Sequence, residues 1–325
     1  MSVMITGGGL VGSQIARLEQ EAGRTPVIFE AAAHNAGLAD FVDLDRAIVV
    51  RGDVTNPLDI VGAIQQHGVT RICHTAAFGN LTLGSNVWPL TSTLVNFMGS
   101  AYIFEAARVL GLERVVLSSS STLYMSLVGG EDKAEYGFEE AHPRPNNVYA
   151  ANKLAAEDLG RAYRNTFGVD VVAVRYAGVF GPWTHGGGGM ATTRMEDWLR
   201  AAMAGQDVEV DLGGGDWIYS KDAGKGTHLA CWAENLDDQL FNLSMGRAYT
   251  SQDIADAINA VVPGNHAKAA PSNAGAAVIS GSAPRPGIMN IDRARKQLGY
   301  EPDFPMPEAI RDYRDWVTTH PTASH

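Results

Sequence analysis

The feature that most constrains the fold is a strict alternation of short apolar runs with helical patterns in the first half of the chain. The apolar runs, each short enough for a buried strand, are Val3–Thr6, Pro26–Phe29, Ala47–Val50, Arg71–His74, Arg114–Leu117 and Val169–Val174. Helical patterns stand between them at Val11–Glu21, Pro57–His67, Thr91–Leu110 and Asn147–Thr166. Strands and helices in this order predict an α/β protein, a doubly wound parallel sheet whose ligands bind at the carboxyl ends of the strands.

A glycine-rich loop follows the first predicted strand and opens the first helix. Gly7, Gly9 and Gly12 give the spacing Gly-x-Gly-x-x-Gly. We expect Gly7 to permit the tight turn, Gly9 to leave room for a pyrophosphate, and Gly12 to allow close packing. Leu10 and Val11 lie in the same loop and are predicted to contact the phosphates. The loop indicates a dinucleotide cofactor and the Rossmann type of sheet, although a purely structural turn is the alternative.

An acidic residue stands where such a site needs one. Glu30 closes the second predicted strand, 18 residues after Gly12. A carboxylate there hydrogen-bonds the adenosine ribose and repels a 2′-phosphate, which favours NAD over NADP. The alternative is a surface glutamate.

Tyr149 and Lys153 are spaced by four residues within a predicted helix, so both side chains lie on one face. A free tyrosine has a pKa of about 10, and a nearby cation favours its phenolate. This pair predicts a proton-transfer catalyst. A lone Tyr-x-x-x-Lys also occurs by chance on protein surfaces, so the pair needs support from the rest of the chain.

Composition limits the partners and the compartment. The net charge of −11 argues against nucleic acid and anionic membranes as partners. Cys73 and Cys231, without metal-ligand spacing, are expected to be reduced core thiols of a cytoplasmic protein, and no side-chain cluster predicts a metal site. Neither a signal peptide nor an apolar run of membrane-spanning length is evident.

Taken together, these residues resemble the extended branch of the short-chain dehydrogenase/reductase family, the NAD-dependent epimerase/dehydratase group. The resemblance runs through essentially the whole chain. Further matching segments are Gly52–Val54, His74–Ala77, Asn96 with Gly99–Ser100, Ser118–Tyr124, Arg175–Pro182, Asp216–Asp222, and Asp292 with Leu298–Tyr300.

The resemblance implies the cofactor contacts. Asp53 would bind the adenine amine, and Tyr176 would pack near the nicotinamide amide, unless it is simply a core aromatic. The full set implied beyond the glycine loop and Glu30 is Asp53, Val54, Ala76, Ala77, Asn96, Ser118, Tyr149, Lys153, Tyr176 and Val179.

The resemblance also implies a catalytic mechanism. Tyr149, as phenolate, would take the proton of a substrate hydroxyl while hydride passes to NAD. Lys153 would hold the nicotinamide ribose and help to lower the Tyr149 pKa. Ser120, four residues before Tyr124, would hydrogen-bond the reacting oxygen. The alternative for Ser120 is that it only caps the turn after the fifth strand.

Departures from the family pattern bear on the substrate. Dehydratases of the group carry acids where Ser121 and Thr122 stand, so their absence argues for simple oxidation and reduction. Nucleotide-sugar enzymes usually carry Asn at Gly178 and Arg at Gly215, whereas Arg285 matches a phosphate-side arginine. The substrate-binding set we expect is Ser120, Ser121, Thr122, Gly178, Arg194 and Arg285.

The second half is expected to build a smaller, discontinuous substrate lobe. We predict a dinucleotide-binding domain over residues 1–175, with returning segments near 216–245, and a substrate lobe mainly over 176–325. Trp183–Gly215 would form a lid, in which His185 is either a second acid/base or, the favoured alternative, a solvent-exposed loop histidine. The surplus of apolar residues in the two long helices agrees with the homodimer that the resemblance implies.

The sequence therefore predicts an NAD-dependent dehydrogenase that acts on a secondary alcohol of a sugar-like, polyhydroxylated small molecule. The alternative is a nucleotide-sugar epimerase, which oxidises its substrate only transiently. A redox-sensing dinucleotide-binding module is the third possibility, but such relatives typically lose the Tyr/Lys pair.

Overall fold

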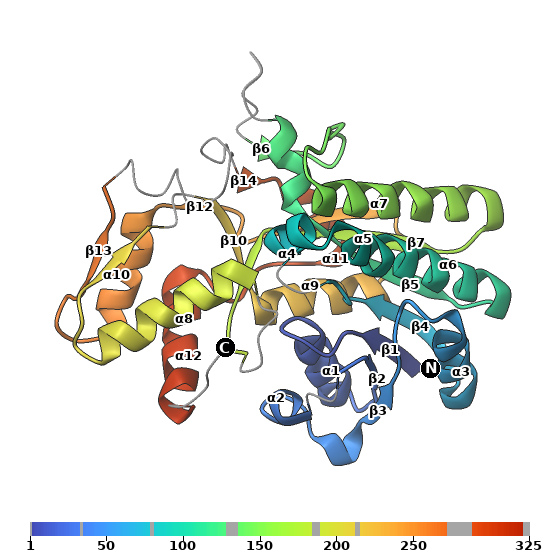
Figure 1. Cartoon of the computed structure of the whole chain (residues 1–325), viewed down its shortest axis with the longest axis horizontal. Helices are drawn as coiled ribbons and strands as arrows, with labels where there is room; N and C mark the ends of the chain where they lie inside the picture. The colour runs from blue at the N-terminus through green and yellow to red at the C-terminus, as the bar shows by residue number, and fades with distance from the viewer. Residues whose placement is uncertain are drawn as a thin grey trace.

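The computed structural model describes residues 2–32, 35–78, 81–127, 136–183, 189–211, 215–271 and 288–320. Its central sheet has seven parallel strands in the order β11-β7-β5-β4-β1-β2-β3 (Figure 1). The order reverses between β1 and β4, which makes the carboxyl ends of these two strands the expected ligand crevice. The strands are β1 (Ser2–Thr6), β2 (Val27–Glu30), β3 (Ile48–Arg51), β4 (Val69–His74), β5 (Arg114–Ser120), β7 (Val171–Tyr176) and β11 (Leu240–Leu243).

The doubly wound parallel sheet is thus confirmed, and so are the six strands expected from the sequence. The structure differs from this expectation in the end of one strand and in one additional strand. Strand β5 continues through three serines to Ser120, because these residues stay paired with β7. Strand β11, which the sequence indicated only as part of a returning segment, pairs with β7 as the seventh strand.

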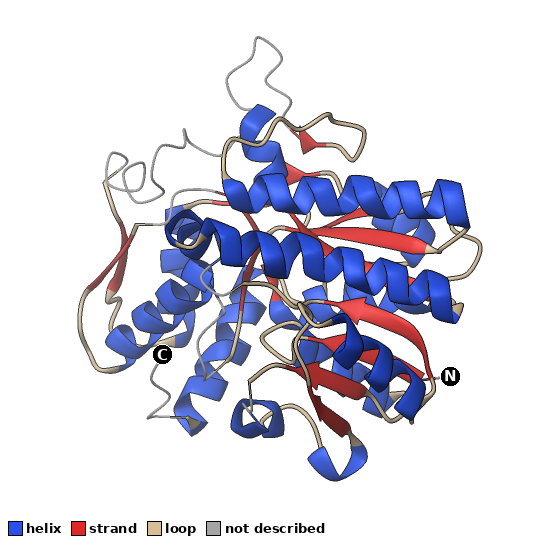
Figure 2. Ribbon diagram, turned by 45° about the vertical axis from the view of Figure 1, so that its right-hand side comes forward, coloured by secondary structure: helices blue, strands red, loops and turns tan. Residues whose placement is uncertain are grey.

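Helices cover both faces of the sheet (Figure 2). Apolar side chains of alternating strand residues point to opposite faces, so each face has its own core. On one face lie α3 (Pro57–His67), α6 (Gly99–Leu110) and α7 (Val148–Phe167). On the other lie α1 (Gly12–Glu21), α9 (Ser220–Trp232) and α11 (Asp292–Leu298).

The long helix expected at Thr91–Leu110 is a composite. It begins as α5 (Pro89–Thr93), passes through a π-helical turn, η2 (Leu94–Met98), and continues as α6. Proline at the first position of α5 suits a helix start, because its missing N–H has no intrahelical partner there. π turns within α-helices often mark functional sites.

The second half of the chain adds a lobe with a separate core. Helices α8 (Gly189–Met203), α10 (Ser251–Val261) and α12 (Met306–Thr319) pack around this core, and all three stand at the left in Figure 1. Its strands are β8 (Gly178–Phe180), β9 (Val208–Val210), β10 (Gly215–Tyr219), β12 (Ala248–Tyr249) and β13 (Ala267–Ala269). The domain boundaries given above stay a prediction.

Smaller elements connect the layers. They are α2 (Asn35–Ala39), η1 (Leu44–Arg46), α4 (Leu81–Val87), η3 (Ser121–Leu127), β6 (Tyr136–Gly137) and β14 (Ile288–Met289). Within the described part of the chain, no helix has both the length and the apolarity to cross a membrane.

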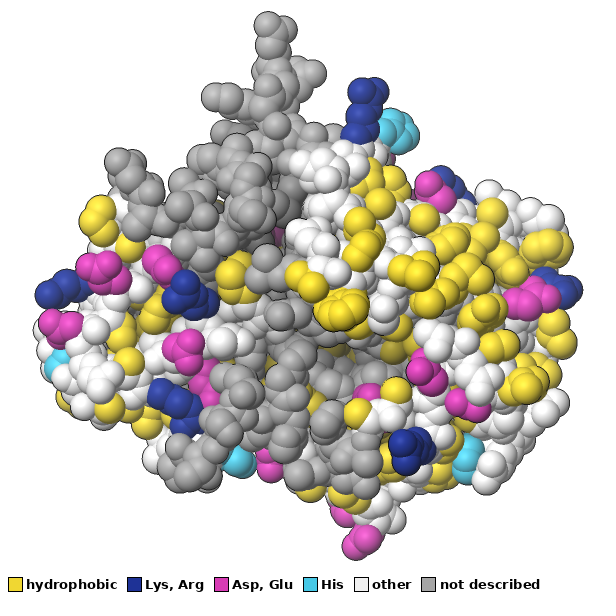
Figure 3. Space-filling model, viewed as in Figure 1, with side chains coloured by type: hydrophobic (Ala, Val, Ile, Leu, Met, Phe, Trp, Pro, Cys, Tyr) yellow, Lys and Arg dark blue, Asp and Glu magenta, His cyan; other side chains and the backbone are white. Residues whose placement is uncertain are grey.

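Apolar side chains gather on the right-hand face of the molecule, in the region of α5, α6 and α7 (Figure 3). The most exposed large ones on or between α4, α5, η2, α6 and α7 are Val87, Trp88, Leu90, Leu94, Val109 and Phe167. Contiguous exposed apolar surface of this kind is typical of a contact with another protein surface.

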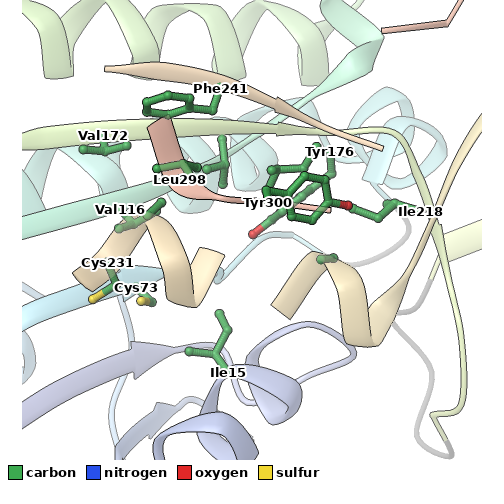
Figure 4. Close-up of a cluster of buried hydrophobic side chains, with 14 of the residues drawn as sticks. Ile15, Cys73, Val116, Val172, Tyr176, Ile218, Cys231, Phe241, Leu298 and Tyr300 are labelled. Atoms are coloured by element: carbon green, nitrogen blue, oxygen red, sulfur yellow. The ribbon is translucent and has the colours of Figure 1, made fainter. Parts of the chain in front are cut away.

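Both cysteines lie in the core beneath the sheet (Figure 4). Cys73 on β4 and Cys231 on α9 are fully buried free thiols. The hydrogen bond with Cys231, together with burial, keeps the pKa of the Cys73 thiol well above its usual value. The expectation of reduced core thiols is confirmed.

Candidate active site

The loops after β1 and β4 meet in close contact. The Thr75 hydroxyl donates to the carbonyl oxygens of Thr6 at 2.8 Å and Gly7 at 2.9 Å. Gly7 has φ +82°, and a Cβ there would lie 2.8 Å from the backbone nitrogen of Ala76. Only glycine fits this position, so the tight turn expected at Gly7 is present.

The other two glycines of the fingerprint have different surroundings. A Cβ on Gly12 would collide with the carbonyl oxygen of Gly7, so the loop itself requires glycine there. A Cβ on Gly9 would meet nothing within 4 Å. Leu10 is buried and Val11 packs on the core, and their cofactor contacts stay a prediction. A small side chain at Gly9 would therefore not disturb the protein itself, which is consistent with the open space predicted there for a pyrophosphate.

Glu30 lies against this loop. Its Oε2 accepts a hydrogen bond from the Gly8 amide at 2.7 Å, and its Oε1 accepts one from Ala32 at 3.3 Å. The carboxylate at the end of β2 is therefore fixed beside the glycine turn. These groups suit the adenosine half of NAD, because backbone amides donate to a pyrophosphate and a carboxylate accepts from the ribose hydroxyls.

The next predicted contacts follow β3. Asp53 is exposed, and its Oδ1 accepts hydrogen bonds from the amide and the hydroxyl of Thr55, both at 2.8 Å. Val54 is buried against Gly99, where an added Cβ would lie 3.0 Å from the valine side chain. An exposed, oriented Asp53 carboxylate fits the predicted adenine contact.

Asn96 has protein partners in the π turn. Its Oδ1 accepts from the Phe78 amide at 3.0 Å, and its Nδ2 donates to the Ser92 hydroxyl at 2.9 Å. The side chain therefore anchors the half-buried segment that contains Ala76 and Ala77. This gives Asn96 a supporting position behind the cofactor residues expected from the sequence.

His74 is the last residue of β4, and its imidazole lies in a buried chain of hydrogen bonds. Its Nδ1 lies 2.6 Å from the Thr6 hydroxyl and its Nε2 lies 3.1 Å from the Ser100 hydroxyl. Burial, with the charge of Lys153 as the lesser cause, lowers the pKa of His74 to about 3. The imidazole is therefore neutral and ties β1, β4 and α6 together.

Helix α7 brings Tyr149 and Lys153 to the ends of these strands. Asn147 caps the helix by accepting a hydrogen bond from the Ala150 amide at 2.9 Å. Tyr149 and Lys153 lie on the buried face, 5% and 3% exposed. The Lys153 Nζ donates to the Ser118 carbonyl oxygen at 2.8 Å and lies 5.8 Å from the centroid of the Tyr149 ring. The two predicted residues therefore share one face at the end of β5.

The electrostatics of this pair differ from the sequence-based expectation. Burial raises the pKa of Tyr149 to about 12, and the hydrogen bond with Ser120 opposes this shift. Burial lowers the pKa of Lys153 to about 8, and the Glu157 carboxylate opposes that shift. The protein's own groups therefore keep the phenol neutral, and a phenolate near neutral pH requires a further positive charge.

Ser120 has partners on two sides, and the capping of the turn that the sequence left open as the alternative is present, whereas its bond to a substrate oxygen stays a prediction. Its side chain is the hydrogen-bond partner of Tyr149. Its Oγ also accepts from the amide and the hydroxyl of Thr122, at 3.2 Å and 3.0 Å, and so caps the turn of η3. The neighbouring Ser121 is half-buried.

A buried network joins the elements that carry these side chains. Arg175 on β7 pairs with Glu157 of α7 and donates from Nη1 to the Tyr124 hydroxyl of η3 at 2.7 Å. The Tyr124 hydroxyl donates to the Asn242 Oδ1 of β11 at 2.8 Å. One guanidinium thus fixes the helix of Tyr149 and Lys153 relative to the turn that follows Ser120.

Tyr176 is a core aromatic. Its hydroxyl bonds with the hydroxyls of Thr227 on α9 and, at 3.4 Å, Ser118, and burial raises its pKa to about 12. Val179 packs on the same core. Gly178 opens β8 and is half-buried. A cofactor contact by Tyr176 or Val179 stays a prediction.

The arginines expected to bind substrate lie farther along the chain. Arg194 on α8 pairs with Asp211 at 3.1 Å, so its charge is partly balanced within the lobe. Arg285 and His185 lie outside the described residues. Among the residues that are described, no group of three or more His, Cys, Asp or Glu side chains could hold a metal ion.

Sequence reasoning missed three roles in this site: the Thr122 donor to Ser120, the Arg175–Glu157–Tyr124 network and the His74 bridge. Arg175 and His74 were noticed only as members of matching segments. A buried arginine in a strand, with an acid one turn after Lys153, was the signal that could have indicated the network.

Comparisons with known proteins agree with this geometry. The profile of the NAD dependent epimerase/dehydratase family matches residues 3–244. A UDP-glucose 4-epimerase of Halalkalibacterium halodurans is 23% identical, over 99% of this chain and 97% of the relative.

Two solved structures share the fold. A UDP-glucose 4-epimerase of Thermus thermophilus in complex with NAD has a TM-score of 0.77 at 22% identity, covering 97% of this chain and 98% of that one. A partial-consensus L-threonine 3-dehydrogenase has a TM-score of 0.81 at 23% identity, covering 98% and 100%. With a dinucleotide crevice, a buried Ser120–Tyr149–Lys153 site and a family profile over most of its length, the chain belongs to the NAD-dependent epimerase/dehydratase family, and its cofactor is NAD.

Proposed function

We propose that the protein is an NAD-dependent dehydrogenase that oxidises a secondary alcohol of a sugar-like, polyhydroxylated small molecule. The observation that carries this proposal is the convergence of Ser120, Tyr149 and Lys153 at the carboxyl ends of the strands, next to the glycine loop. When bound, NAD supplies the hydride acceptor and a positive charge.

Each protein group then has a defined task. Tyr149 accepts the proton of the substrate hydroxyl at its phenolic oxygen, and Ser120 holds the same substrate oxygen by a hydrogen bond. Lys153, a buried cation with a lowered pKa, would hold the nicotinamide ribose and stabilise the phenolate. Burial of all three side chains keeps water away from the proton transfer.

Dehydration fits the site less well. Elimination of water needs a second acid or base beside the catalytic hydroxyl, and Ser121 and Thr122 stand at those positions. Neither hydroxyl titrates near neutral pH. This supports hydride transfer as the whole of the chemistry.

A nucleotide-sugar epimerase is the second candidate. It is favoured by the match along almost the whole chain to a relative named UDP-glucose 4-epimerase. In that reaction the same Tyr149 would remove and later return one proton, with no net change of cofactor. The position of Arg194, paired with Asp211, gives a phosphate anchor in the lobe little support.

Absorbance of reduced nicotinamide distinguishes the two. The purified protein is mixed with NAD+ and a panel of free sugars, uronates, aldonates, UDP-sugars and L-threonine, with Tyr149→Phe as the matched control. Stoichiometric reduction of NAD+ by one compound, absent in Tyr149→Phe, supports the dehydrogenase. Conversion of a UDP-sugar to its epimer without net reduction supports the epimerase. Equal turnover by Tyr149→Phe would refute both mechanisms, and NAD binding without turnover of any compound would favour a redox-sensing module.

We also propose a homodimer formed through α5, α6 and α7. Its support is the exposed apolar surface there, in which Trp88 is 63% and Leu90 71% exposed. Sedimentation at micromolar concentration should show dimers, and Trp88→Ser with Leu90→Ser should give monomers. Only monomers for the unaltered protein would refute this proposal.

A further inference from the structure

The Ser120 hydroxyl is engaged by both polar hydrogens of a single residue. The Thr122 amide donates to the Ser120 Oγ at 3.2 Å, and the Thr122 hydroxyl donates to the same atom at 3.0 Å. Thr122 is half-buried in η3, immediately after the end of β5. Both donors thus approach the catalytic serine from the side of the turn.

A serine hydroxyl has one hydrogen to donate and two lone pairs to accept with. With both lone pairs occupied by Thr122, Ser120 can act toward other partners only as a donor. Its other neighbour in the site is the hydroxyl of Tyr149. The two bonds from Thr122 therefore leave Ser120 only its own hydrogen to offer to the Tyr149 hydroxyl.

We propose that Thr122 is a positioning residue, which holds Ser120 as a hydrogen-bond donor, toward the phenolic oxygen of Tyr149 before the substrate binds and toward the reacting oxygen of the substrate afterwards. The inference rests on the proposed function, because it assumes that Tyr149 works as a phenolate. It gives Thr122 a task different from the substrate contact expected from the sequence.

The physical effect is on the ionisation of Tyr149. A donor directed at the phenolic oxygen favours the phenolate, whereas an acceptor favours the neutral phenol. Without the Thr122 hydroxyl, Ser120 regains a free lone pair and can accept from the phenol instead. Hydrogen bonds in a chain also strengthen one another, by about 10–30% per bond. Removal of the hydroxyl should therefore raise the pKa of Tyr149.

The ionisable groups around the Tyr149 and Lys153 pair stay in place when Thr122 changes. Lys153 and, one turn further, Glu157 come from the same helix. Tyr176 and Arg175 come from β7, and the neutral His74 comes from β4. A shift in the Tyr149 titration caused by substituting Thr122 therefore reflects the loss of the Thr122 hydroxyl.

The test is a titration of Tyr149 in the protein saturated with NAD+, which needs no substrate. Tyrosinate absorbance is followed against pH for each protein and for the same protein with Tyr149→Phe, and the difference gives Tyr149 alone. Thr122→Val removes the hydroxyl and keeps the branched shape, and Thr122→Ala takes its place if Thr122→Val does not fold. Thr122→Ser restores the hydroxyl. Thr193→Val, which removes a half-buried hydroxyl from α8, is the matched control.

We expect Thr122→Val to raise the pKa of Tyr149 by about half a unit, with Thr122→Ser and Thr193→Val close to the unaltered protein. If Thr122→Val leaves the titration unchanged while Ser120→Ala moves it, Thr122 only caps the turn and the proposal is wrong. The proposal is equally wrong if Thr122→Ser fails to restore the titration. Failure of the dehydrogenase proposal is a separate result, namely turnover by Tyr149→Phe.

Discussion

Arg175 donates two hydrogen bonds to Glu157, from Nε to Oε1 at 2.9 Å and from Nη2 to Oε2 at 2.6 Å. The two side chains are 3% and 7% exposed, so the pair is shielded from water. Glu157 lies one turn after Lys153 on α7. The pair is therefore both a structural link between α7 and β7 and part of the electrostatic surroundings of the catalytic lysine.

Arg175→Met should destabilise the protein by about 3–5 kcal/mol, because it leaves the Glu157 carboxylate buried without a counter-charge. The matched control is Arg161→Met, which breaks the exposed Arg161–Asp158 pair of the same helix and should cost less than about 1 kcal/mol. Urea unfolding followed by circular dichroism gives both values. A similar small cost for both variants would show that Glu157 does not depend on Arg175.

Lys153→Met should stabilise the protein at about pH 7, by about 1–2 kcal/mol, despite the loss of the bond to Ser118. Burial lowers the pKa of Lys153 from 10.5 to about 8, so between these values the folded protein binds fewer protons than the unfolded chain. Stability of the unaltered protein therefore rises with pH across this window, and the advantage of Lys153→Met should shrink.

Unfolding midpoints at about pH 7 and about pH 10 measure this difference. The exposed Lys296→Met is the control and should show no such change between the two conditions. An advantage of Lys153→Met that stays constant with pH would mean that the lysine is not desolvated.

His74→Gln should lower the stability of the protein near neutral pH and raise it, relative to the unaltered protein, in acid. Burial lowers the pKa of His74 from 6.5 to about 3, so the folded protein binds fewer protons than the unfolded chain between these values. Stability of the unaltered protein therefore falls as the pH drops through this window, by about 3 kcal/mol at about pH 4. Glutamine does not titrate, so the variant should become the more stable protein there. The exposed His142→Gln should follow the unaltered protein at every pH, and parallel curves for His74→Gln would contradict the prediction.

Two alanine substitutions in the glycine loop should separate folding from cofactor binding. Gly12→Ala should lower the unfolding midpoint strongly, since its Cβ would collide with the Gly7 carbonyl oxygen. Gly9→Ala should leave the midpoint almost unchanged, because its Cβ meets nothing within 4 Å. It should nonetheless weaken NAD binding at least tenfold, a cost of about 1.4 kcal/mol. Calorimetric titration with NAD+ is the measurement, and normal affinity of Gly9→Ala would place the pyrophosphate elsewhere.

The fold could be predicted because buried parallel strands are continuous apolar runs with helical crossovers between them. The last strand shows the limit of that signal. Asn242 lies in the middle of β11 and is fully buried, which an apolar pattern does not suggest. Its Nδ2 donates to the carbonyl oxygens of Gly137 and Asn290, so partners distant in sequence satisfy it.

The candidate site could likewise be predicted only in part. Helical spacing was enough to bring Tyr149 and Lys153 to one face, whereas Ser120 was indicated by the family pattern, four residues before Tyr124. The raised pKa of Tyr149 could not be read from the sequence, because it arises from burial by the whole surrounding fold. The task of Thr122 was equally hidden, since the direction of a hydroxyl depends on the turn that it occupies.

The π turn at Leu94–Met98 has a consequence for the surface of the molecule. Such a turn holds one residue more than an α-helical turn, so α5 is rotated by about 100° from where a continuous helix would place it. Deleting one residue of the turn could restore an unbroken α-helix, yet it would swing Trp88 and Leu90 around the helix axis. The extra residue of the π turn thus sets the direction in which the apolar end of the helix, with Trp88 and Leu90, faces.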